Sequence, residues 1–244
     1  MSEMVARVES DRGVALIIAM MATTLLLTLG GALILLSSSE TGIAANFRAA
    51  HEARYAADAG LERALADLRR EPDFTPVLNG ALRSSFVDGL PSGTRTLVDG
   101  SSIDLDKTTN LANCNKPTVC SAAELLATTS DRPWGTNNPR WTPYAYGPLA
   151  NMLARSTVRS TFYVVVFIGD DSSENDGDAS LDGFSVGGAP NPGNGIVQLR
   201  AEAFGPRNTH AVIEATVSRL ELAPAAPGEQ SSTELRVLTR NDVR

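Results

Sequence analysis

Histidine is scarce in this chain of 244 residues, and the common catalytic sequence motifs are absent from it. The two histidines, His51 and His210, lie far apart, and neither is near a candidate nucleophile in the sequence. The chain has no G-x-S-x-G element, P-loop, H-E-x-x-H motif or dinucleotide-binding fingerprint. General acid–base catalysis therefore has little support, and we predict that the protein is not an enzyme.

Basic residues are also outnumbered. The chain has 21 Lys and Arg residues against 28 Asp and Glu residues, which gives a formal net charge of −7 at pH 7. Proteins that bind nucleic acid neutralise its phosphates with clustered Lys and Arg side chains, and this sequence has no basic stripe. The composition argues against a nucleic-acid partner and against anchoring by anionic lipids.

Cysteine occurs only twice, as Cys114 and Cys120 in the segment NCNKPTVCS. If this part of the chain is exported, the pair is expected to form one disulfide that closes a short loop. A zinc site is the alternative interpretation. Two thiolates do not fill a tetrahedral zinc shell, and neither histidine is near in sequence, so we favour the disulfide.

Against these absences stands one long hydrophobic run, VALIIAMMATTLLLTLGGALILL, at residues 14–36. Its only polar side chains are Thr23, Thr24 and Thr28. As a helix with a rise of about 1.5 Å per residue it spans roughly 35 Å, enough to cross the ~30 Å hydrocarbon core of a bilayer. A cleaved secretory signal has a shorter apolar core followed by a small-residue cleavage site, which is missing here. We predict a membrane-spanning helix.

The helical pattern continues beyond this run. Residues 37–70 contain no proline and are rich in Ala, Leu, Glu and Arg, which are good helix formers. Apolar residues recur at helical spacing and predict an amphipathic helix. Glu71-Pro72 is the expected end, because the residue before a proline is disfavoured in the helical conformation.

Several short segments near the N-terminus are typical of one family: Arg12-Gly13 directly before the apolar run, SSSE at residues 37–40, NFR at residues 46–48 and AADAGLE at residues 56–62. Through these segments, residues 12–68 resemble the N-terminal region of PilX-type minor pilins, a branch of the type IV pilin superfamily. The resemblance implies that residues 1–13 are a leader, cleaved after Gly13 by the inner-membrane prepilin peptidase. It also implies methylation of the new amine of Val14.

One position departs from the pattern of the superfamily. Major pilins usually carry Glu as the fifth mature residue, where it pairs with the N-terminal amine of a neighbouring subunit, but this chain has Ile18 there. An unpaired charge in an apolar fibre core is costly, so a subunit without the carboxylate cannot neutralise the next amine. In related systems such a subunit lies at the fibre tip. Ile18 therefore indicates a tip-proximal minor subunit.

Residues 71–244 are expected to form a globular head. Its first part is rich in Gly, Pro, Ser, Thr and Asn and predicts loops with short elements: strands at residues 95–98 and 102–105 and a helical turn at residues 122–127. Residues 133–148 are aromatic and proline-rich. We expect the rings of Trp134, Trp141, Tyr144 and Tyr146 to pack beneath a loop against the core, with a recognition surface as the alternative.

Three segments rich in β-branched residues predict strands at residues 157–168, 196–204 and 209–220, with residues 205–208 joining the last two as a hairpin. Alternation in the second strand predicts an antiparallel sheet with one buried face, which the helix at residues 37–70 covers. Residues 232–239, after a linker at 224–228, form an edge strand or trail as a tail. The expected fold class is α+β.

Acidic residues gather between the first two of these strands, in DDSSENDGDASLDG at residues 170–183. Oxygen-rich loops of this kind suit Ca²⁺, and we favour Asp176, Asp178 and Asp182 as ligands, although the spacing does not match an EF-hand. The alternative is a solvated acidic loop. Calcium is thus the candidate cofactor. The six acids are Asp170, Asp171, Glu174, Asp176, Asp178 and Asp182.

The sequence therefore predicts a minor type IV pilin-like subunit, made as a single-pass inner-membrane precursor with a periplasmic head and then incorporated near the tip of a pilus at the cell surface. Its expected partners are other pilin subunits, bound through the N-terminal helix, and the prepilin peptidase. It would start or cap assembly and support adhesion. A type II secretion pseudopilin and a signal-anchored periplasmic calcium- or ligand-binding protein are the alternatives.

Overall fold

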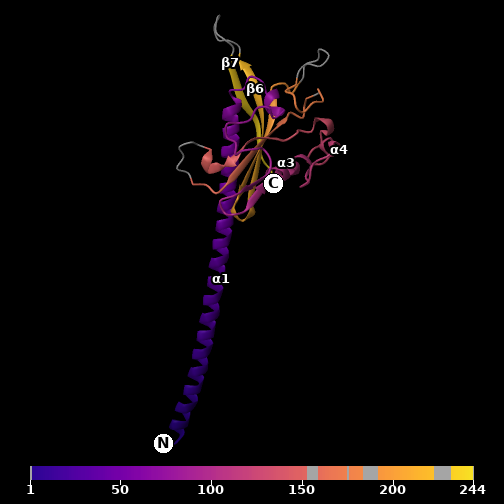
Figure 1. The fold of residues 1–244 in the computed structure, drawn as a ribbon. Helices are drawn as coiled ribbons and strands as arrows, with labels where there is room; N and C mark the ends of the chain where they lie inside the picture. Colours follow the sequence, from indigo (N-terminus) through magenta and orange to yellow (C-terminus); the bar gives the residue numbers. More distant parts are fainter. Residues whose placement is uncertain (1, 153–158, 175, 184–191, 223–231, 244) are drawn as a thin grey trace. The chain divides into compact units, whose positions relative to one another are not determined.

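The computed structural model of the protein describes residues 2–152, 159–174, 176–183, 192–222 and 232–243, with the backbone alone at residues 2–12, 221–222 and 232. The chain divides into two compact units, Met1–Ala49 and Ala50–Arg244. The elements are labelled in Figure 1.

One helix, α1 (Ser2–Leu68), contributes to both units. It begins before the expected residue 14 and ends two residues before the expected residue 70. Gly30, Gly31 and Gly42 do not interrupt it. Within the first unit, described side chains from residue 13 onward are exposed except at Gly30 and Ala49, which are partly exposed.

In the second unit, α1 buries a stripe of small and apolar side chains at helical spacing. The stripe packs on one face of a five-stranded sheet, against alternate residues of its strands such as Val164, Val166, Leu199 and Ile213. The predicted α+β fold, with the helix on an antiparallel sheet, is confirmed. The stripe consists of Ala53, Ala56, Ala57, Leu61, Ala64, Leu65 and Leu68.

The sheet is an antiparallel meander whose strands follow in chain order, β3-β4-β5-β6-β7. The strands are β3 (Thr142–Pro148), β4 (Tyr163–Asp170), β5 (Ile196–Gly205), β6 (Thr209–Leu222) and β7 (Ser232–Val243). The three strands predicted from β-branched residues are present, as β4, β5 and β6. The first of them starts later than expected, at Tyr163, and its expected residues 157–158 lie outside the described part.

Both edges of the sheet differ from expectation. Residues 232–239 form the edge strand β7, which continues to Val243, while the expected linker at 224–228 lies outside the described residues. At the other edge, β3 was expected to be loop. Its prolines, Pro143 and Pro148, are compatible with an edge strand because the outer side of such a strand needs no ladder donor, and the register shifts beside Pro143.

The strand β7 is tied to α1 by ion pairs. Arg240 pairs with Asp58 and, at 3.5 Å, with Glu62, while Arg54 Nε lies 2.9 Å from Asp242 Oδ1. Because most of these side chains are substantially exposed, each pair contributes little stability, about 0–1 kcal/mol. They align the edge strand along the helix.

A second layer covers the other face of the sheet. It contains a two-stranded hairpin of β1 (Thr94–Thr96) and β2 (Ser102–Asp104), followed by α3 (Leu105–Cys114). Tyr163, Val165 and Phe167 of β4 point into this layer, so every residue of β4 is buried. The expectation of a sheet with only one buried face is therefore wrong for this strand. Its run of consecutive apolar residues is the sequence signal of burial on both faces.

Short elements complete the unit. They are α2 (Thr75–Leu78), α4 (Ala122–Leu125), η1 (Gly135–Asn137), η2 (Leu149–Asn151) and η3 (Pro206–Asn208). The expected helical turn at residues 122–127 corresponds to α4, and the expected short strands correspond to β1 and β2. The helix α3 has no counterpart among the expectations.

Candidate functional site

The first unit presents apolar side chains on all sides of α1. Leu33, Ile34, Leu35 and Leu36 are 65%, 72%, 73% and 57% exposed, and four consecutive helical residues at about 100° apart point to every side. A helix that is apolar all round is normally surrounded by lipid or by other helices. This segment therefore lacks the cover that α1 finds on the sheet from Ala53 onward.

The polar groups of this segment are satisfied within the helix. Thr23 Oγ1 donates to Met20 O at 2.9 Å, Thr24 Oγ1 to Met21 O at 2.9 Å, and Thr28 Oγ1 to Leu25 O at 2.8 Å. In a membrane every polar group must find its partner inside the protein. Among the described residues, Gly13–Leu68 is the helix that is long and apolar enough to span a bilayer. Its residues 14–36 are suited to membrane anchoring.

The predicted processing residues lie near the start of this span. Gly13 and Val14 are consecutive residues of α1 with exposed side-chain positions. Ile18 follows Val14 by four residues, so the two lie on the same face of the helix, and Ile18 is 61% exposed. The face that begins at the predicted mature N-terminus is thus wholly apolar where a carboxylate was expected.

Residues 12–62 match the family model described as PilX N-terminal. This region is similar to the PilX N-terminal family. The match confirms the resemblance that the sequence predicts for the N-terminal region. No curated protein and no solved structure matches the chain. Residues 63–244 lie outside the matched PilX N-terminal region, so their roles depend on their own geometry.

The six acids after β4 lie in different surroundings. Asp170, Glu174 and Asp176 come together, with one carboxylate oxygen of each within 4.8 Å of the others. Asp170 ends β4 and is 4% exposed, and Glu174 is 3% exposed. Burial raises the pKa of Asp170 to about 9, and the negative charge of Glu174 adds to the effect. The cluster is therefore a strongly electronegative, buried site.

Two of the three residues favoured from the sequence lie elsewhere. Asp182 accepts hydrogen bonds from Gly195 N at 2.7 Å and Phe74 N at 3.3 Å, and Arg219 Nη2 lies 3.2 Å from its Oδ2. It joins this loop to the start of α2 and to β6. Asp178 is exposed and accepts from Ser180 Oγ at 2.6 Å and from Ser180 N at 3.0 Å; these hydrogen bonds hold a local turn, and both, the one from the hydroxyl most, lower the pKa of Asp178.

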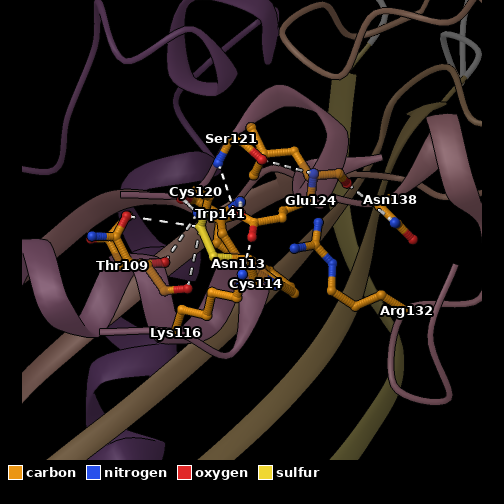
Figure 2. The surroundings of a disulfide bond; sticks show 12 residues. Thr109, Asn113, Cys114, Lys116, Cys120, Ser121, Glu124, Arg132, Asn138 and Trp141 are labelled. Carbon is orange, nitrogen blue, oxygen red and sulfur yellow. Dashed lines mark hydrogen bonds and ion pairs between the residues drawn. A yellow bond between two sulfur atoms is a disulfide. The ribbon is translucent and has the colours of Figure 1, made fainter. Parts of the chain in front are cut away.

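The two cysteines form the predicted disulfide, which is confirmed. Figure 2 shows that it joins the end of α3 to the residue before Ser121, the N-cap of α4. Ser121 and Glu124 form a capping box, and Glu124 also pairs with Lys116 inside the closed loop. These contacts hold the loop in a defined conformation, and the disulfide lies where a structural bond would close it.

The neighbouring Asn113 connects the disulfide region to the sheet. Its Nδ2 donates to Trp141 O at 2.9 Å, and Trp141 N donates to its Oδ1 at 2.9 Å (Figure 2). The ring of Trp141 is buried, as are Tyr144 and Tyr146, whereas Trp134 is 45% exposed. The aromatic segment therefore packs mainly into the core, as expected, with Trp134 as the exception.

A polar groove of about 700 Å³ lies between α3, the β1–β2 hairpin and the start of β6. On its floor Glu202 Oε2 lies 2.9 Å from His210 Nε2, and Glu202 Oε1 lies 2.6 Å from Arg200 Nε. Burial opposes ionisation of Glu202, but the hydrogen bonds and charges of His210 and Arg200 outweigh it and lower its pKa. Arg200 also bonds Glu214 at 2.6 Å.

This polar cluster is not evident from the sequence because its members are spread over two strands. The alternation along β5 places Arg200 and Glu202 on the face opposite the one that α1 covers, but the second layer above that face was not predicted. The signal that could have revealed it is the register of the predicted hairpin, which sets Glu202 opposite Val212 and Phe204 opposite His210. The ring of His210 stacks on that of Phe204 with centroids 4.6 Å apart.

Proposed function

We propose that the protein is a minor subunit of a type IV pilus, made as an inner-membrane precursor with a periplasmic head. The prepilin peptidase cleaves it after Gly13, Val14 becomes the methylated N-terminus, and the helix then leaves the bilayer for the filament. The observation that carries this proposal is the all-round apolar surface of residues 14–36 within the region similar to the PilX N-terminal family. Helix association would replace lipid contacts with contacts to neighbouring pilin helices.

Cleavage is tested by co-expressing the full chain with a prepilin peptidase and measuring the mass of the product. The expected result is loss of residues 1–13 from the unaltered chain and persistence of the full-length form in Gly13→Ala. Gly42→Ala is the matched control, because it makes the same substitution within the same helix away from the cleavage position. A full-length product in every case would contradict the proposal and favour a plain signal anchor.

We further propose that the subunit lies at or near the pilus tip, where it starts or caps assembly and presents the head for adhesion. The support is Ile18, which leaves the subunit without the carboxylate that neutralises the amine of its neighbour. Burying that amine unpaired would cost several kcal/mol. The subunit is therefore tolerated best at a position where it need not pair with an adjacent N-terminus.

The position is tested by immunogold labelling of filaments with an antibody to the head. Label is expected at one filament end for the unaltered chain and along the shaft for Ile18→Glu, which restores the carboxylate. Ile18→Leu keeps an apolar side chain of the same size and should keep the label at the end. Label along the shaft in the unaltered chain would contradict tip placement while leaving pilus membership intact.

A further inference from the structure

Three carboxylates converge where β4 runs into the acidic loop. Asp170 is supplied by the last residue of the strand, and Glu174 and Asp176 by the loop that follows. One oxygen of each lies within 4.8 Å of the others. Ionised carboxylates at this separation and out of water repel one another, so all three can ionise together only beside a compensating positive charge.

Two oxygens of the cluster lack a partner. Asp170 is only 4% exposed, and its Oδ1 has no hydrogen-bond partner among the described residues. Oδ2 of Asp176 is likewise buried and without a partner in the described part of the chain. Leaving a buried acceptor unsatisfied costs free energy, and more when the group is charged. Oδ1 of Asp170 is therefore open to a ligand that the described residues do not supply.

The surrounding backbone holds the carboxylates in place. Glu174 N donates to Asp171 O at 3.1 Å, and Gly183 N donates to Glu174 Oε1 at 3.0 Å. Asp178 N donates to the other oxygen of Asp176 at 2.9 Å. Within the described residues no ion pair reaches Asp170 or Asp176. Arg219 is paired instead with Asp182 of the same loop.

We propose that Asp170, Glu174 and Asp176 form a calcium site. Ca²⁺ binds oxygen ligands at about 2.3–2.6 Å, so two ligands on opposite sides of the ion lie about 4.6–5.2 Å apart. The oxygens of this cluster, all within 4.8 Å of one another, fit around one such ion. Carboxylates without sulfur or imidazole ligands disfavour zinc and copper, and the flexible geometry of Ca²⁺ suits a loop better than the strict octahedron of Mg²⁺.

A bound ion would join the end of β4 to the loop at two positions, four and six residues further along the chain. It would satisfy Asp170 Oδ1 and Asp176 Oδ2 and remove the repulsion among the three acids. The site differs from the set favoured by the sequence. Asp178 and Asp182 belong to a local turn and to an internal ion pair, so Asp176 alone is common to both sets.

The test uses the full chain in detergent micelles, titrated with CaCl₂ by isothermal calorimetry. A dissociation constant of about 10⁻⁴–10⁻³ M is expected, in the range of extracellular calcium modules. Asp170→Asn and Asp176→Asn should each weaken binding at least about tenfold, as expected for loss of a ligand. Asp178→Asn is the matched control and should bind as the unaltered chain does.

Thermal unfolding, followed by tryptophan fluorescence, shows whether each variant is folded, so that a loss of binding is not confused with a folding defect. Calcium should raise the unfolding temperature of the unaltered chain and of Asp178→Asn. Without calcium, Asp170→Asn should unfold at no lower a temperature than the unaltered chain, because the amide is similar in size and takes a carboxyl group out of the acidic cluster, and calcium should no longer shift it. No calcium-dependent heat or shift in the unaltered chain, or equal binding by Asp170→Asn, would overturn the proposal. An equal response to MgCl₂ would overturn the assignment to calcium.

Discussion

Between residues 14 and 36, α1 exposes apolar side chains on every side, whereas between residues 50 and 68 the same helix buries one apolar stripe against the sheet. The difference lies in the sequence. The first part has no charged residue to define a polar face, and the second alternates Ala and Leu with Arg, Glu and Asp. One part therefore needs cover from a membrane or from other subunits, and the other already has it within the chain.

The largest effect that separates the two parts should come from removing a leucine in each. Leu61 is fully buried against the sheet, so Leu61→Ala should lower the free energy of unfolding of the head by about 2–5 kcal/mol. Leu27 is 78% exposed, and Leu27→Ala should change it by no more than about 0.5 kcal/mol. Urea unfolding of the full chain in detergent, followed by tryptophan fluorescence, measures both, because Trp134 and Trp141 lie in the head. Equal losses of unfolding free energy in the two variants would contradict the difference in packing between the two parts of α1.

Opening the disulfide should weaken the head without involving either part of α1. The double variant Cys114→Ser, Cys120→Ser removes a bond with a sequence separation of 6, and the chain-entropy estimate for so short a loop is about 2 kcal/mol. Lys116→Ala is the control inside the loop. It breaks only the ion pair with Glu124, which is worth about 0–1 kcal/mol. Urea unfolding under non-reducing conditions compares them, and a larger loss in the control would contradict the structural role of the bond.

A glycine within residues 50–68 and one before them in α1 give a finer comparison. A Cβ at Gly60 would collide with the side chain of Val164 and lie 3.2 Å from Val166 Cγ2, whereas a Cβ at Gly42 meets nothing within 4 Å. Gly60→Ala should therefore destabilise the head by about 1–2 kcal/mol, since overpacking outweighs the gain in helix propensity. Gly42→Ala should leave the unfolding of the head unchanged and favour the helix by about 0.5–1 kcal/mol. A stabilised Gly60→Ala would show that helix and sheet separate easily.

The two parts of α1 were also the most predictable from sequence, because uniform apolarity and helical periodicity are local signals. The strands β4, β5 and β6 were predictable for the same reason, from their β-branched residues. The strand β3 was not, since TPYAYGP contains two prolines and a glycine and is a strand only because β4 pairs with it. The helix α3, LDKTTNLANC, is short and mostly polar, and its docking on the sheet supplies what its sequence lacks.

The acidic loop shows where prediction from sequence ended. Its composition indicated a cation-binding loop, but the choice among six acids depends on contacts that are distant in sequence. Asp182 is occupied by Arg219, 37 positions away, and Asp170 is buried because it continues a strand that is covered on both faces. Only the folded arrangement separates Asp182, which is paired internally, from Asp170 and Asp176, each of which has one oxygen without a hydrogen-bond partner among the described residues.

The smallest expected effect is a pH dependence on the face of the sheet opposite α1. The pKa of Glu202 is lowered in the folded protein from its ordinary value of 4.5, so its ionised form adds stability above about pH 4.5 that is lost as the pH falls through the lower value. Glu202→Gln keeps an acceptor for Arg200 and His210 but removes the charge. It should cost about 1 kcal/mol at neutral pH and nearly nothing near pH 3.

Urea unfolding between pH 3 and pH 7 measures this difference. Among the described residues, the other charged or titratable groups that line or adjoin the site are Asp104, Lys107, Arg200, His210 and Glu214. Because Leu61 lies on the opposite face, the effect of Glu202→Gln should add to that of Leu61→Ala within about 0.5 kcal/mol. A strongly non-additive result would mean that the two layers of the head are coupled through the sheet. Additivity would instead show that the contacts of α1 with the sheet and the polar contacts on the opposite face of the sheet stabilise the head independently of each other.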